Sequence, residues 1–424
     1  MFPKKLQRKI DQRTMQDALR SLGKRSVHVD FCSNDYLGFS GDKEIAQKAH
    51  HLLRKKDIVQ NGATGSRLLS GNHILYNEVE KYLSKVHQAD ATLIFNSGYD
   101  ANLGFFGAVP QRGDIILYDE LIHASIRDGI QMSNAKSYKF SHNNAEDLAR
   151  KLKKFRLKTN LTTATEIQEK SIHHNTENLE KDNFEELTLS QIEEPAISIV
   201  EVPVLSGVEV YVVTESVFSM DGDSPDLVAF SKLCNEYYAH LVVDEAHAVG
   251  VFDNGLVQHY NLHQDIFARI ITFGKALGSH GAAVLGSADL ITYLINFSRS
   301  FIYTTALPPH TLATIKAAYH KLETSAASQK LHQNIAIFQD QIKKNKLQGV
   351  YIQSNSAIQT IVISGNKEVK EAASYLQRNN FEVSPILSPT VPKGKERLRF
   401  CLHSYNTQEE IATVLSLLAT FVRT

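Results

Sequence analysis

The segments LVVDEAH at residues 241–247 and RIITFGKALG at residues 269–278 decide the fold that we expect for this chain. Each begins with a short apolar run, which predicts a strand buried on both faces, as in a parallel sheet. Each run then leads to a reactive side chain, Asp244 in the first segment and Lys275 in the second. Because ligands of open parallel sheets bind at the carboxyl ends of the strands, we expect both side chains to face one ligand.

An acid and a lysine at neighbouring strand ends suit a cofactor that needs an anion at one end and an amine at the other. Pyridoxal phosphate (PLP) is that cofactor, since its aldehyde condenses with a lysine and a carboxylate keeps its ring nitrogen protonated. The letters DEAH also mark one helicase class, but that class requires a phosphate loop GxxxxGK[ST]. Here Ala276 follows Gly274 and Lys275, so the magnesium-binding hydroxyl is missing. A formal net charge of +0 also gives no basic footprint for nucleic acid.

The composition is that of an ordinary globular protein with material for two or three domains. The chain has 424 residues, of which 42% are apolar and 22% are charged. No apolar run approaches the roughly 18 residues of a membrane span, and the start lacks the apolar core of a secretory signal. Cys32, Cys234 and Cys401 lie far apart without CxxC spacing. This pattern predicts free thiols, no metal site and a cytoplasmic protein without membrane contact.

The order of the predicted elements divides the chain into three regions. Residues 1–60 form an N-terminal segment, residues 61–309 a large domain of alternating strands and helices, and residues 310–424 a smaller α+β domain. We expect the small domain to pack with the N-terminal segment. Residues 156–206 are polar and lack a sustained apolar period, which predicts a solvated insertion in the large domain. In the small domain we expect a long helical region at residues 310–345. We expect short strands at residues 358–363, 381–384 and 397–402.

Further stretches of the large domain carry residues that suit an anion or a flat ring. The glycines of GATGSR at residues 62–67 form either a phosphate nest or a tight loop, and the tight loop is the commoner outcome. A strand at residues 93–95 leads into Gly98 and Tyr99, where we expect a helix whose N-terminus presents free N–H groups to an anion. His123 is either an ordinary polar loop residue or a ring that lies flat on a cofactor.

Seven motifs in a fixed order make the chain resemble the α-oxoamine synthases, which are PLP-dependent enzymes of the aspartate aminotransferase fold (fold type I). The resemblance covers almost the whole chain except the insertion, and the motifs are SNDYLG from residue 33, SGY from 97, DELIHAS from 119, ESVFSMDGD from 215, DEAHAVG from 244, TFGKALG from 272 and YTTALPP from 303. The segment PTVPKG at residues 389–394 makes the 8-amino-7-oxononanoate synthases the most similar branch, although 5-aminolevulinate synthases carry a similar PTVP. The fold implied is α/β, with a large domain built on a mainly parallel sheet and a smaller α+β domain.

The resemblance assigns catalytic roles around the cofactor ring. Lys275 would hold PLP as a Schiff base and move the Cα proton of the substrate. Asp244 would pair with the ring nitrogen, and His123 would stack on the ring and touch the substrate. His247, with Ser219 nearby, would hydrogen-bond the phenolic oxygen.

The resemblance also implies residues for the phosphate and the substrate. The phosphate would be bound by Gly98, Tyr99 and Thr272, and across a dimer interface by Thr304 or Thr305. Arg399 would bind the amino-acid carboxylate, because the guanidinium fork accepts a carboxylate in two parallel bonds. A surface ion pair between Arg399 and an acid such as Glu396 is the alternative. The remaining substrate contacts would be Arg20, Asn34 and Thr390. After Arg399 the sequence CLHSYN replaces the usual Ala-Ala-His, which leaves the details of the substrate site open.

The activity implied is that of a homodimeric acyltransferase of biotin biosynthesis. L-alanine would condense with a pimeloyl thioester, carried by coenzyme A or by an acyl-carrier protein, with loss of carbon dioxide to give 8-amino-7-oxononanoate. A sister synthase that uses glycine or serine with another acyl-CoA is the main alternative. A non-catalytic partner subunit would lack the lysine, and Lys275 is present.

Overall fold

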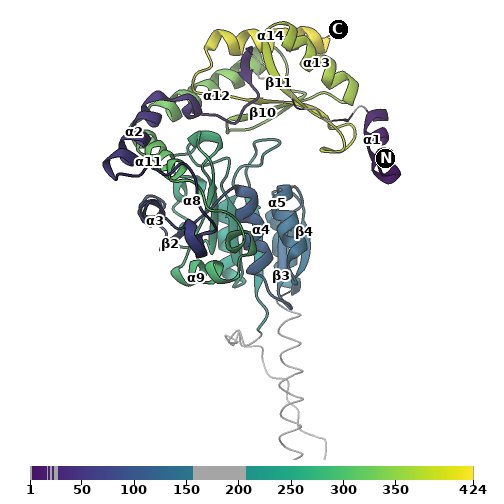
Figure 1. Ribbon diagram of the computed structural model, residues 1–424. Coiled ribbons are helices and arrows are strands. Elements are labelled where there is room, and N and C mark those ends of the chain that lie inside the picture. Colours follow the sequence, from purple (N-terminus) through teal and green to yellow (C-terminus); the bar gives the residue numbers. More distant parts are fainter. Residues whose placement is uncertain (1, 17, 20–21, 23–26, 156–206, 424) are drawn as a thin grey trace, which may run out of the picture.

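The computed structural model describes residues 2–16, 18–19, 22, 27–155 and 207–423. Arg20 and the polar segment at residues 156–206 therefore lie outside the described residues. The described chain forms a large part around one sheet and a smaller part that carries the C-terminus (Figure 1). None of the helices in these ranges is long and apolar enough to cross a membrane.

A seven-stranded sheet forms the centre of the large part. In spatial order its strands are β2 (Ala91–Phe95), β8 (Ala282–Gly286), β7 (Ala268–Thr272), β6 (His240–Asp244), β5 (Val210–Glu215), β3 (Ile115–Asp119) and β4 (Lys136–Phe140). Strand β8 runs antiparallel to β2 and β7, and the pairs from β7 to β4 are parallel. The two segments that were expected to decide the fold are β6 and β7, which lie side by side. The prediction of a mainly parallel sheet is confirmed.

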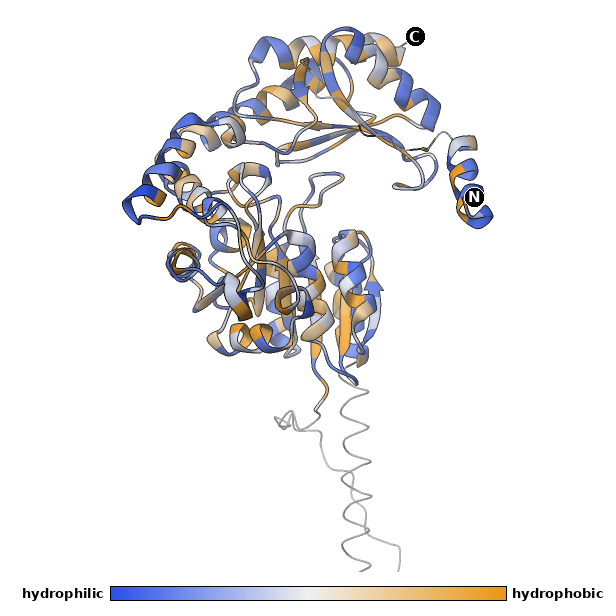
Figure 2. Cartoon of the chain, in the orientation of Figure 1, coloured by the Kyte–Doolittle hydropathy of each residue, from blue (hydrophilic) through white to orange (hydrophobic). Residues whose placement is uncertain are grey.

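Helices cover both faces of this sheet because both faces of its strands are apolar. In β6, Val242 packs into one apolar cluster, while Leu241 and Val243 pack into the cluster on the opposite face. Figure 2 shows hydrophobic residues along the central strands of the large part. The elements around the sheet are α3 (Ile74–Val86), α4 (Gly98–Ala108), α5 (Ala124–Met132), a helix described over residues 145–155, α7 (Leu227–Glu236), α8 (Leu256–His259), the short turn η3 (Lys275–Leu277), α9 (Ala288–Phe297) and α10 (Arg299–Ile302).

The small part is built on a second, five-stranded sheet. Its spatial order is β1 (Val29–Phe31), β11 (Phe381–Ile386), β12 (Arg397–Cys401), β10 (Ile358–Val362) and β9 (Tyr351–Ile352). Strand β1 pairs in parallel with β11, so the N-terminal segment contributes a strand to the C-terminal sheet. Helices α12 (Ala327–Lys344), α13 (Asn366–Arg378) and α14 (Gln408–Arg423) accompany this sheet, and α1 (Lys4–Met15) lies near it (Figure 1). Helices α2 (Lys43–Lys55) and α11 (Pro309–Thr324) pack against each other, α11 also contacts α3 and η3 of the large part, and η1 (Phe39–Gly41) contacts η3.

The predicted helical region at residues 310–345 is two helices, α11 and α12. Ser325 takes an extended backbone conformation that ends α11. Its hydroxyl then accepts a hydrogen bond from the backbone N–H of Ala327 at 3.1 Å, which starts the next helix. A serine that bonds to its own neighbouring backbone favours such a break, and periodicity alone did not reveal it.

The glycine-rich stretch near residue 65 folds as a tight loop followed by η2 (Arg67–Gly71). The carbonyl of Gly65 accepts a hydrogen bond from the N–H of Ala306 at 3.0 Å. A Cβ on Gly71 would lie 2.1 Å from that same carbonyl oxygen, so the close approach requires glycine. The tight-loop interpretation is therefore supported over the phosphate nest.

Candidate active site

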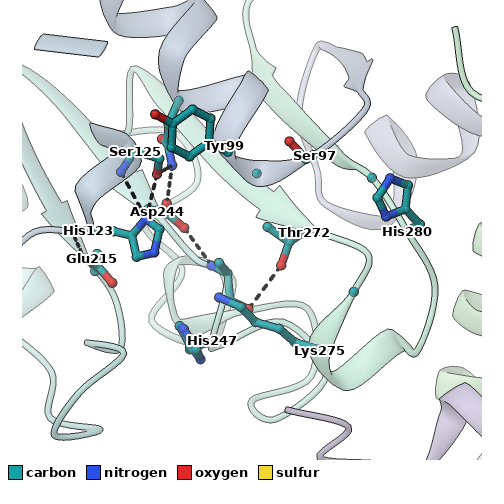
Figure 3. Close-up of a pocket in the computed structure, with 15 residues that line it drawn as sticks. Ser97, Tyr99, His123, Ser125, Glu215, Asp244, His247, Thr272, Lys275 and His280 are labelled. Atoms are coloured by element: carbon teal, nitrogen blue, oxygen red, sulfur yellow. Dashed lines mark hydrogen bonds between the residues drawn. The ribbon is translucent and has the colours of Figure 1, made fainter. Parts of the chain in front are cut away.

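A cavity of about 270 Å³ opens at the carboxyl ends of the central strands (Figure 3). Strand β6 ends at Asp244 and β7 ends at Thr272, and Lys275 follows one turn later. The cavity thus gathers side chains from separate strand ends, as open α/β sheets do. Among the residues predicted from the sequence, its lining includes Gly98, Tyr99, His123, Asp244, His247, Thr272 and Lys275.

Lys275 begins η3 with a backbone φ of +37°, in the left-handed region that non-glycine residues rarely adopt. Such backbone strain concentrates at functional positions. In the described part of the chain, its ammonium group has no hydrogen bond or ion pair. Burial lowers the pKa of Lys275 to about 8, although the charges of Asp244 and Glu215 act in the opposite direction. About a tenth of the amine is therefore neutral and nucleophilic at pH 7, far more than for an ordinary lysine.

The Asp244 carboxylate is oriented by two hydrogen bonds. Its Oδ2 accepts from the side-chain amide of Asn102 at 2.9 Å, and its Oδ1 accepts from the N–H of Ala246 at 2.9 Å. The same Asn102 amide donates to the hydroxyl of Ser125 at 3.0 Å. The Oδ1 of Asn102 is buried without a partner among the described residues. This fixed carboxylate is suited to face a cationic ring nitrogen.

His123 caps the N-terminus of α5 and presents its ring to the cavity (Figure 3). Its Nδ1 shares a hydrogen bond of 2.7 Å with the hydroxyl of Ser125, and its backbone N–H donates to Glu215 Oε1 at 2.6 Å. Burial lowers the pKa of His123, which favours the neutral form of the ring. Its position is thus held from both the backbone and the ring.

His247 lies on the loop after β6, with its Nδ1 2.8 Å from the Tyr36 hydroxyl. Burial, together with the charge of Lys275, holds the pKa of His247 well below its usual range. Tyr36 also donates to Asn34 Oδ1 at 3.1 Å. A neutral, fixed imidazole at this point can hydrogen-bond a ligand without carrying charge.

The N-terminus of α4 faces the same cavity and suits a phosphate. Ser97 caps the helix by accepting from the N–H of Asp100 at 3.0 Å, so the first N–H groups, at Gly98 and Tyr99, remain for a ligand. A Cβ on Gly98 would lie 2.8 Å from the methyl of Thr272, which explains the glycine. The amine, the carboxylate, the flat ring and this helix end match the aldehyde, ring nitrogen, π face and phosphate of PLP. The residues present therefore fit PLP.

Sequence reasoning missed Glu215, which lines the cavity at the end of β5. Glu215 is the direct neighbour of Asp244 across the parallel pair β5–β6. Burial, and then the charge of Asp244, raise the pKa of Glu215 to about 8. The available signal was its place at a strand end, at the start of ESVFSMDGD. Asn102, Ser125 and His280 also line the cavity and were not predicted.

Arg399 is not among the residues that line this cavity, yet its charge acts on both Lys275 and His247. Its side chain is buried and donates to the carbonyl of Ser219 at 2.7 Å and to Asn34 Oδ1 at 3.1 Å. The alternative of a surface pair with Glu396 is wrong. The Glu396 carboxylate instead accepts backbone N–H groups of Gly365 and Gly394, each at 2.9 Å.

Four other predicted residues do not line this cavity. Ser219 and Thr390 line a neighbouring cavity. The side-chain amide of Asn96 donates to Thr304 Oγ1 at 3.3 Å and to the carbonyl of Thr305 at 2.5 Å. Their assignments remain predictions, and Arg20 lies outside the described residues.

Comparison with known proteins gives matches that cover most of the chain. Residues 26–418 match the model of the aminotransferase class I and II family. An 8-amino-7-oxononanoate synthase of Emericella nidulans is 37% identical over 415 residues, covering 94% of this chain and 90% of that one. An 8-amino-7-oxononanoate synthase of Haemophilus ducreyi is 32% identical over 401 residues, covering 92% and 90%.

Solved structures resemble the chain over nearly its full length. A serine palmitoyltransferase variant from S. paucimobilis with bound PLP–myriocin aldimine has a TM-score of 0.79 at 22% identity, covering 99% of this chain and 97% of that chain. An 8-amino-7-oxononanoate synthase from Francisella tularensis has a TM-score of 0.69 at 25% identity, covering 94% and 98%. At 22% identity the first likeness establishes the fold alone.

Proposed function

Since the chain belongs to the aminotransferase class I and II family and is an α-oxoamine synthase that uses PLP, we propose that it condenses L-alanine with a pimeloyl thioester. Carbon dioxide and the free thiol carrier leave, and the product is 8-amino-7-oxononanoate. The observation that carries this substrate choice is the 37% identity to the Emericella nidulans enzyme over 94% of this chain.

Three cavity residues and the nearby Arg399 have defined tasks in this reaction. Lys275 holds the cofactor aldehyde through its amine and later moves the proton at the substrate Cα. The Asp244 carboxylate keeps the ring nitrogen protonated, and His123 covers the ring face and orients the substrate. When bound, PLP supplies the electron sink for the carbanion and for loss of carbon dioxide. Arg399 binds the amino-acid carboxylate with its guanidinium fork.

The rate of thiol release, measured for different pairs of amino acid and acyl donor, tests which substrates the enzyme prefers. Alanine, glycine and serine are each combined with pimeloyl, acetyl and palmitoyl thioesters of coenzyme A, and the pimeloyl donor is also supplied on acyl-carrier protein. We expect the highest kcat/KM for alanine with a pimeloyl donor. Preference for glycine or serine with another donor would replace this proposal by the sister-synthase alternative.

The functional unit in this proposal is a cytoplasmic homodimer. Tyr303, directly before Thr304 and Thr305, is 73% exposed in the single chain, and helix α1 buries none of its residues. An exposed aromatic beside a predicted phosphate contact suits coverage by a second copy. Sedimentation of the holoenzyme is expected to show a dimer, and a fully active monomer would contradict it.

A further inference from the structure

A second cavity, of about 310 Å³, adjoins the candidate active site. His123 lines both cavities, so they meet at the ring that faces the cofactor site. The second cavity lies between the large part and residues 390–392 of the small part. Its apolar walls are Leu121, Ile122, Phe218, Met220, Val391 and Pro392. A space of this chemistry next to the reacting centre suits an alkyl chain.

Two of the cations that line this second cavity are already neutralised. Arg397 forms an ion pair with Asp221 and donates from Nε to the carbonyl of Lys395 at 2.8 Å. His142 contacts Asp119 at 2.9 Å through Nδ1 and Asp223 at 2.7 Å through Nε2. Neither side chain has a free charge to offer a ligand.

Arg127 is the lining cation that keeps its charge available. Its guanidinium donates to the backbone carbonyl of Glu120, and no carboxylate of the described residues lies within ion-pair distance of it. The nearest acids in sequence have other partners. The Asp128 carboxylate accepts from the Tyr99 hydroxyl at 2.5 Å, and the Glu120 carboxylate pairs with Lys139 at 3.3 Å. Arg127 therefore retains donors for an anionic ligand.

The spacing between His123 and Arg127 fixes where that anion would bind. His123 caps α5 and Arg127 lies in the first turn of that helix, so both residues line the same cavity and lie about 6 Å apart along the helix axis. A chain that begins at the reacting carbonyl beside His123 would run along the apolar walls toward the guanidinium. The anion would therefore stand at the far end of a short to medium alkyl chain.

We propose that the second cavity holds the acyl chain of the donor and that Arg127 binds an anionic group at the distal end of that chain. The donor class is then the mono-thioester of a dicarboxylic acid. This inference rests on the proposed function, because it takes an acyl thioester as the second substrate. Arg127 is a specificity residue in this scheme and takes no part in bond making.

The test compares two seven-carbon donors on the same carrier, pimeloyl-CoA with a terminal carboxylate and heptanoyl-CoA with a terminal methyl group. With alanine saturating, Arg127→Gln is expected to raise KM for pimeloyl-CoA about 10- to 100-fold, as for loss of a charge-assisted bond. For heptanoyl-CoA the change should stay under about twofold, because the variant leaves the apolar walls intact. Arg127→Lys should restore part of the pimeloyl preference. Arg112→Gln, at an exposed arginine outside the cavity, is the matched control.

Equal effects of Arg127→Gln on both donors would overturn the inference, since they would place Arg127 on the shared carrier or in the fold. Calorimetric titration of the holoenzyme with pimelate and with heptanoate separates this inference from the proposed function. If the wild-type enzyme turns over neither donor, the proposed function fails. Tighter binding of pimelate, weakened in Arg127→Gln, would then still support the cavity assignment. Pimelate binding no tighter than heptanoate in the wild type would overturn it.

Discussion

Two clusters of titratable side chains lie at the same edge of the central sheet, and they are built on opposite principles. In the first, His142 lies between the carboxylates of Asp119 and Asp223, and each ring nitrogen has a close partner. In the second, Lys275 and Glu215 share a cavity with no hydrogen bond or ion pair on the lysine amine from the described residues.

The pKa values show what this difference achieves. Burial opposes charge on His142, but its hydrogen bonds to Asp119 and Asp223 raise the pKa to about 10 and keep the ring charged. Burial moves the pKa of Lys275 down to about 8 and that of Glu215 up to about 8, which favours the neutral forms. Paired charges stabilise a loop, whereas under-paired charges keep a group ready to react.

The largest effect is expected at Lys275, the group whose charge lacks a partner. Lys275→Ala should abolish turnover while the protein folds and binds PLP without a covalent link, because no other lysine of the described residues lines the cavity. Thiol release measures the activity, absorbance of the bound cofactor measures the link, and thermal unfolding checks the fold. Near-normal turnover in Lys275→Ala would contradict the assignment of this cavity as the active site.

Asp244→Asn is expected to lower kcat by roughly a thousandfold while PLP remains bound. The amide oxygen can still accept from the N–H of Ala246, but the amide cannot hold a ring nitrogen protonated. Glu215→Gln is the matched variant at the adjacent strand end, and we expect a smaller loss from it because Glu215 contacts the backbone of His123. Wild-type rates in Asp244→Asn would mean that another acid serves the ring.

Arg399 and Arg397 allow the comparison of paired and unpaired charges to be tested within one strand. They share a face of β12, yet Arg397 is paired with Asp221 while Arg399 contacts neutral acceptors. Arg399→Ala should raise KM for alanine about 10- to 100-fold, with a much smaller change for the acyl donor. Arg397→Ala should change KM for alanine less. A larger effect of Arg397→Ala on alanine saturation would show that the wrong arginine was chosen.

The smallest effect is expected at the paired cluster, and it concerns stability. The pKa of His142 is raised from about 6.5 in the unfolded chain to about 10, so the folded state binds more protons between these values. Its stabilisation is complete below about pH 6.5 and is lost as the pH rises through about 10. His142→Asn should therefore lower the free energy of unfolding by about 2 kcal/mol at pH 6 and by less at pH 10. The exposed His259→Asn is the control, and an equal loss at both pH values would refute the charge argument.

The parts of the site that depend on local order were predictable from the sequence. A short apolar run followed by a polar motif predicts a strand end, so Asp244 and Lys275 could be placed there without information from distant parts of the chain. The strand-end position of Glu215 was visible in the sequence, but neither its role nor that of Asn102 can be read from local patterns, because both roles arise from contacts with distant residues. Glu215 matters through its register with Asp244, and Asn102 reaches Asp244 from a helix 142 positions away.

Tyr36 is a further residue whose contact could not be read from local sequence, and its partner lies even farther away along the chain. It was quoted as part of SNDYLG, but its hydrogen bond to His247 spans 211 positions of sequence. The domain boundaries remain a prediction, although β1 does join the small sheet. Helix breaks such as the one at Ser325 depend on a single side-chain bond, which helical periodicity does not detect.

The pairing of β1 with β11 has a consequence for how the protein is made. Strand β1, at residues 29–31, is synthesised long before its partner β11, at residues 381–386. Asn34 meets Arg399 under the same constraint. The part of the site predicted to bind the amino acid can therefore assemble only after residues 381–399 have been synthesised, and contacts of such long sequence separation form slowly. The large sheet, whose strands all lie between β1 and β11 in the sequence, is free to fold first.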